Sequence, residues 1–96
     1  MTPEILARLA GFGIELAGDA QGISILVRGE CIALVAGSSI GSSGIMTGSG
    51  LAYLVWRDGR PLLVSKGSET AAASEQVETI RRFSEDLKTA LEPVAL

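Results

Sequence analysis

The side chains that could carry chemistry in this sequence are few, and they gather in one stretch. Tyr53 is followed by Arg57, Arg60 and Lys66 within Leu51–Lys66, which reads LAYLVWRDGRPLLVSK. An aromatic ring with cations around it can stack on a nucleic-acid base and bind the phosphates, and the same cations can bind an acidic protein. This stretch is therefore the candidate binding site.

The rest of the chain contains few residues that could form a catalytic or metal-binding site. There is no histidine, so Ser-His-Asp and Cys-His machinery and His-containing zinc sites are excluded. Cys31 is the single cysteine, which excludes thiolate clusters and an intramolecular disulfide, and its apolar strand predicts a buried, unreactive thiol. No spacing pairs Glu15, Asp19 or Glu30 for acid–base work. We therefore predict a non-enzymatic protein without catalytic residues, cofactor or metal.

The glycine-rich segment 37–50, GSSIGSSGIMTGSG, invites comparison with a phosphate-binding loop. Ten of its fourteen residues are Gly or Ser, but no lysine and no helix follow its glycines. The segment offers only Ile40, Ile45 and Met46 as apolar anchors. We expect a flexible loop, the alternative being a loop that becomes ordered on a partner.

The candidate site lies on a predicted hairpin. Asp58-Gly59 accepts the positive φ angles of a two-residue turn, which pairs Tyr53 with Val64, Val55 with Leu62 and Arg57 with Arg60. Because side chains alternate, the face predicted to meet the core collects Ala52, Leu54, Trp56, Pro61, Leu63 and Ser65. Trp56 is expected under the C-terminal helix. The missing N–H of Pro61 favours an edge strand over Leu62 to Ser65.

Helices are expected at both ends of the chain. Thr2-Pro3-Glu4 begins a short helix that Gly11 or Gly13 ends. A long amphipathic helix starts after a cap at Ser68, Thr70 or Ser74 and stops before Pro93; its apolar stripe comprises Val77, Ile80, Phe83, Leu87 and Leu91.

Between the helices, Ile14–Ala17 and the hairpin formed by Ile23–Val27 and Cys31–Val35 read as further strands. The hairpin strands are apolar at nearly every position, as in a sheet covered on both faces. The fold class is α+β: a short N-terminal helix, an antiparallel sheet of four or five strands built from two hairpins, and a long C-terminal helix packed on one face.

Composition places the chain among single-domain globular proteins, with residues 1–96 as one domain. It is 47% hydrophobic and carries a net charge of −3. Residues 1–67 hold five acids and five bases, and residues 68–96 hold six acids and three bases, so the negative charge comes from the C-terminal part. The acidic total argues against nucleic acid as a partner. No signal peptide and no apolar stretch of membrane-spanning length is seen, which predicts a cytoplasmic protein without a membrane.

Two helices can cover only one face of such a sheet, although both faces are apolar. We therefore expect a protein-interaction module that self-associates as a homodimer, and an acidic protein is another candidate partner. The predicted interface has an apolar centre of Tyr53, Val55, Leu62 and Val64 and a basic rim of Arg57, Arg60 and Lys66. Two alternatives stay open: the short helix and the Gly/Ser loop fold over that face, or the face binds single-stranded nucleic acid in an accessory protein.

Overall fold

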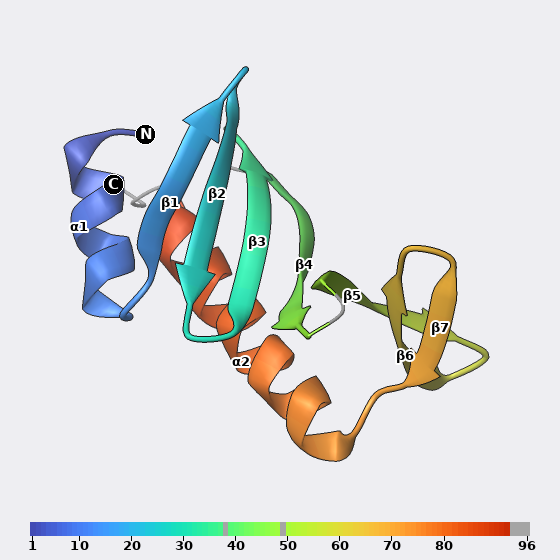
Figure 1. The fold of residues 1–96 in the computed structure, drawn as a ribbon. Coiled ribbons are helices and arrows are strands. Elements are labelled where there is room, and N and C mark those ends of the chain that lie inside the picture. The colour runs from blue at the N-terminus through green and yellow to red at the C-terminus, as the bar shows by residue number, and fades with distance from the viewer. Residues whose placement is uncertain (38, 49, 93–96) are drawn as a thin grey trace.

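The computed structural model describes residues 1–37, 39–48 and 50–92. It confirms an α+β protein with a helix at each end of an antiparallel sheet (Figure 1). The strand number predicted from sequence is wrong, because the described residues form seven strands whose order in the sheet follows the chain. The elements are α1 Pro3–Gly11, β1 Glu15–Ala20, β2 Ile23–Arg28, β3 Cys31–Ala36, β4 Ser39–Thr47, β5 Gly50–Arg57, β6 Arg60–Ser65, β7 Ser68–Ala71 and α2 Ser74–Leu91.

The additional strands come from two stretches whose side chains carry little strand signal. β4 occupies most of the segment predicted to be a loop, where its backbone pairs with both β3 and β5; residues 38 and 49 of that segment lie outside the described residues. β7 covers Ser68 and Thr70, two of the predicted helix caps. In both cases the backbone hydrogen bonds of a neighbouring strand outweigh a weak intrinsic preference.

The hairpin at Asp58-Gly59 forms as predicted. Asp58 and Gly59 have φ angles of 53° and 73°, as a two-residue turn with positive φ at both positions requires. The predicted partners Tyr53 and Val64, Val55 and Leu62, and Arg57 and Arg60 are all confirmed. The alternation of faces along β5 and β6 therefore follows the sequence prediction.

The edge assignment of β6 is wrong. β7 pairs with β6 and forms the edge of the sheet instead. Pro61 tolerates this neighbour because it lies at the end of the β6–β7 ladder, where its carbonyl accepts a 3.1 Å bond from the N–H of Ala72. Only the return bond, which proline cannot donate, is missing.

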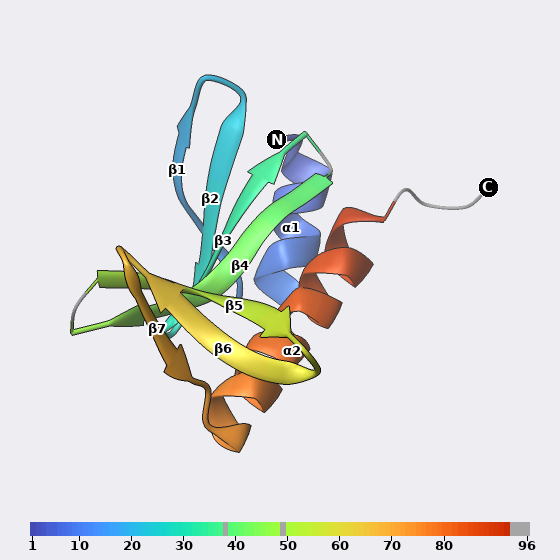
Figure 2. The same cartoon turned by 90° about the vertical axis from the view of Figure 1, so that its right-hand side faces the viewer.

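Both helices lie on one side of the sheet (Figures 1 and 2). α1 packs against β1 and α2, and α2 packs across β3 and β4. The core between these layers contains, among others, Leu9, Ile14, Leu26, Val35, Ile80, Phe83 and Leu87. We call the side that meets the helices the inner face and the opposite side the outer face.

The helix ends show why α1 and α2 begin where they do. The Oγ of Thr2 accepts a bond from the N–H of Ile5, as predicted for the first helix. At the second helix none of the predicted hydroxyl caps is used, since the side chain of Gln76 accepts from the N–H of Ala73 at 2.8 Å. α2 ends at Leu91; the predicted stop, Pro93, lies outside the described residues.

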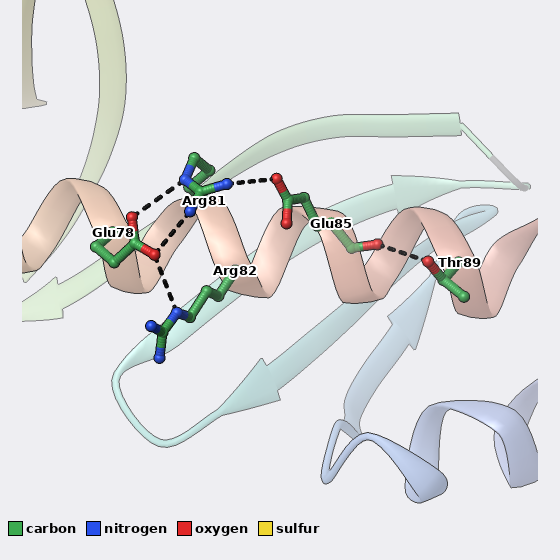
Figure 3. A network of polar contacts seen from close by, with 5 residues as sticks. All are labelled: Glu78, Arg81, Arg82, Glu85 and Thr89. Carbon is green, nitrogen blue, oxygen red and sulfur yellow. Dashed lines mark hydrogen bonds and ion pairs between the residues drawn. The ribbon is translucent and has the colours of Figure 1, made fainter.

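The solvent side of α2 is held by ion pairs rather than by apolar contacts. Arg81 bonds Glu78 and Glu85, each at 2.7 Å, and Arg82 bonds Glu78 at 3.0 Å (Figure 3). These pairs lie one turn apart on the surface of the helix, where water screens them and weakens their contribution to stability. This side of α2 is therefore a solvated surface.

One polar junction ties the first hairpin to both helices. The guanidinium of Arg28 donates to Asp86 at 2.7 Å and to the carbonyl of Phe12 at 3.1 Å. Its carbon centre lies 5.4 Å from the centroid of the Phe83 ring, within the range of a cation–π contact. Because Arg28 is engaged in this way, it is not a cation available to a partner.

Trp56 is the clearest error of the sequence prediction on the inner face. Along the inner side of β5, Ala52 is buried and Leu54 half-buried, while Trp56 is 62% exposed. Burial therefore falls along the strand toward the turn at Asp58-Gly59. Trp56 borders a groove of about 330 Å³ beside α2, whose other walls include Val77, Ile80, Arg81 and Ser84.

Candidate interaction surface

The outer face of the sheet carries apolar side chains over two separate pairs of strands. The cross-strand registers place Ile25 beside Leu34 and Val27 beside Ile32 on β2 and β3. On β5 and β6 they place Tyr53 beside Val64 and Val55 beside Leu62. All eight are half-buried, and both helices lie on the opposite side of the sheet (Figure 2). These residues make an apolar surface that α1 and α2 do not cover.

β4 separates the two apolar areas with small residues. Its outer positions include Ser42, opposite Leu34, and Gly44, between Ile32 and Tyr53. A Cβ on Gly44 would lie 2.0 Å from the carbonyl oxygen of Ala52. Glycine is therefore required here by the close approach of the β5 backbone. Between the two apolar areas, these positions of β4 carry little or no side chain.

The seven residues predicted as the binding site lie together on the β5–β6 part of this surface or at its ends. Tyr53, Val55, Leu62 and Val64 form its centre, and Arg57 and Arg60 face each other beside the turn. Lys66 follows β6 in the next turn. The structure thus brings the predicted residues together.

A hollow of about 590 Å³ opens at one end of this group. Tyr53, Val64 and Lys66 line it, together with Leu51 and the flanking Gly50, Ser65 and Gly67. Its walls are mainly apolar, and Lys66 supplies the charged group. Val55 and Leu62 lie farther along the same face and do not line it.

The three cations of the predicted rim differ in their surroundings. Arg57 bonds Glu69 at 2.6 Å, a contact that spans strand β6. This pair explains how Arg57 tolerates Arg60 directly opposite, although both partners are exposed and the pair is worth about 1 kcal/mol at most. Within the described part of the chain, the side chains of Arg60 and Lys66 take part in no hydrogen bond or ion pair.

Sequence reasoning missed three features of the surface. Glu69 was not recognised as the partner of Arg57, because β7 was not predicted and the acid could not be placed on the sheet. The outer positions of β2 and β3 were not included in the site, although their apolar character at nearly every position was the signal for a second covered face. Leu51 was also left out of the predicted site, although the alternation of side chains puts it on the same side of the strand as Tyr53.

The thiol and carboxylate groups of the described residues do not form a reactive or metal-binding centre. Cys31 is buried, with its Sγ 3.9 Å from the carbonyl oxygen of Thr79, and burial raises the pKa of its thiol above the ordinary value of 9.0. Such a thiol is a poor nucleophile near neutral pH. Among residues 1–37, 39–48 and 50–92, no three carboxylate or thiol groups gather as a metal ion would need.

No helix in the described ranges is both long enough and apolar enough to cross a membrane.

No protein-family model, curated protein or solved structure matches the chain.

Proposed function

We propose that this protein is a non-enzymatic interaction module that associates with a second copy of itself through the outer face of its sheet. The observation that carries the proposal is the apolar surface on the side of the sheet opposite the helices. Its centre, Tyr53, Val55, Leu62 and Val64, contains no charged side chain. Interface centres are depleted of charge and enriched in tyrosine, with polar residues at the rim.

The first alternative from sequence, in which parts of the same chain cover this face, has lost its support. α1 packs against β1 and α2, and most of the segment predicted as a loop is strand β4 within the sheet. Neither element is therefore free to fold over Val55 and Leu62. A second chain remains the natural cover for such a patch.

Single-stranded nucleic acid is the weaker candidate for this face. Tyr53 is its one aromatic residue, and Arg57 is held by Glu69. Binding through Arg60 and Lys66 alone would be weak and strongly dependent on salt. An acidic protein would meet the same two cations. Titration with a single-stranded oligonucleotide at low and high salt separates the nucleic-acid alternative from self-association.

Sedimentation equilibrium over a range of protein concentrations tests the proposal. We expect the wild-type mass to rise toward two chains and Val55→Lys to stay at one, because the new charge would be buried in the interface. Trp56→Lys is the matched control, since it places the same side chain on the inner side of the same strand. A mass of one chain at every wild-type concentration, or equal behaviour of the two variants, would rule out association through this face.

A further inference from the structure

The hollow beside Tyr53 has the composition of a small-molecule site as well as that of an interface edge. Its volume of about 590 Å³ falls in the range of roughly 300–1,000 Å³ typical of ligand pockets. Leu51, Tyr53 and Val64 offer apolar walls, and Lys66 is the one charged residue of the lining. Apolar lining with a few placed polar groups is how such pockets fix a ligand's orientation.

The charges around the hollow select the kind of ligand. Glu69 lies on the same face, opposite Val64, but its carboxylate is bonded to Arg57. Lys66 therefore remains as a positive charge without an ionic partner in the described part of the chain. A single ammonium matches a single negative charge, and it lacks the planar fork with which arginine binds a phosphate in two places.

The geometry points to a site for an amphipathic carboxylate, a free small molecule with an apolar chain and one carboxylate group. The chain lies along Leu51, Tyr53 and Val64, and the carboxylate meets Lys66. This ligand goes beyond self-association, and the two share Tyr53 and Val64. In the wild-type protein, binding therefore weakens as association increases.

The test uses octanoate, with octanol as the uncharged probe of the same chain length. Amide chemical shifts are followed during titration of Val55→Lys, a variant that keeps every residue lining the hollow. Octanoate should give saturable shifts at Leu51, Tyr53, Val64 and Lys66, and octanol should bind more weakly. The titration is repeated on wild-type protein at low micromolar concentration, so that the result holds even if Val55→Lys disturbs the strand.

Two variants separate the role of Lys66 from a general effect of charge. Lys66→Gln should weaken octanoate binding about two- to fivefold, the worth of an exposed ion pair, without changing octanol binding. Arg60→Gln removes the same charge outside the hollow and should leave both unchanged. Absent or non-saturable shifts, equal affinity for the two probes, or equal effects of the two variants would overturn the site. A wild-type protein that stays a single chain would overturn self-association and leave this result intact.

Discussion

At the scale of single residues, position along a strand matters as much as the face on which a side chain lies. Ala52 and Trp56 share the inner side of β5, yet the first is buried and the second is 62% exposed. Alternation correctly assigns both to the helix side. Alternation gives the face of a side chain and not the depth at which it is buried, so the burial of Trp56 was predicted wrongly.

This difference predicts contrasting costs for two truncations on the inner face. Trp56→Ala should lower the free energy of unfolding by less than about 1 kcal/mol, because most of the ring is already in water. Leu63→Ala, at a position only 6% exposed, should cost about 2–5 kcal/mol. Urea unfolding of both variants measures the two values. A larger loss for Trp56→Ala than for Leu63→Ala would contradict the placement of the β5 end.

Gly44 provides a second prediction at the scale of a residue. A methyl group there would lie 2.0 Å from the Ala52 carbonyl oxygen, so one of the two backbones must move. Gly44→Ala should cost about 3 kcal/mol in unfolding free energy or prevent folding. Gly48→Ala is the control, since its Cβ would meet nothing within 4 Å, and it should change stability by at most about 0.5 kcal/mol. Similar costs for the two variants would show that β4 and β5 do not approach this closely.

At the scale of secondary-structure elements, the sequence predicts best where a backbone requirement is met by few residue types. Asp58-Gly59 predicts a two-residue turn because both positions of that turn need positive φ, and the β5–β6 register follows from the turn. β4 and β7 could not be predicted in the same way. Their pairing depends on hydrogen bonds to the backbones of neighbouring strands. The Gly/Ser-rich sequence of β4 and the SETA sequence of β7 carry few side chains that would indicate a strand.

The composition of β4 still predicts its dynamics. Ser39, Ser42 and Ser43 offer little apolar contact, and the ladder to β3 shifts register between Leu34 and Val35. We expect amides of the first half of β4 to exchange with deuterium faster than those of β3, because local opening there breaks few contacts. Hydrogen exchange followed by NMR measures this difference. Equal protection of both strands would show that backbone pairing alone makes β4 rigid.

The ion pairs of α2 predict a pH dependence of known sign. Hydrogen bonds from Arg81, and then from Arg82, lower the pKa of Glu78 below its ordinary value of 4.5. A carboxylate whose pKa is lowered by folding stabilises the protein above the unfolded value, and this contribution disappears as pH falls through the folded value. The Glu78 contribution is therefore present at neutral pH and lost below about 4.5.

Urea midpoints of wild type and Glu78→Gln, measured between neutral and acidic pH at low salt, check this expectation. The two proteins should differ at neutral pH and converge as Glu78 becomes protonated. High salt should reduce the difference at neutral pH, since the pairs are exposed. A difference that does not change with pH would show that Glu78 acts through something other than its charge.

At the scale of the whole molecule, the arrangement of layers leads to the functional proposal. Both helices pack on the inner face (Figure 1). The outer face presents one apolar area on β2 and β3 and another on β5 and β6. Sequence reasoning identified the second area from its alternation. It recognised both faces of β2 and β3 as apolar but left their outer residues out of the site, because the apolar run from Ile23 to Val35 does not say which side the helices cover.

A dilution series of amide spectra tests the central claim, that the outer face binds a second copy, most directly. From millimolar to low micromolar protein, the amides of Val55 and Leu62 should shift together along one concentration-dependent curve. The indole N–H of Trp56, on the inner side of the same hairpin, should not move. Shifts centred on Trp56 and α2, or spectra unchanged over the whole range, would contradict the account.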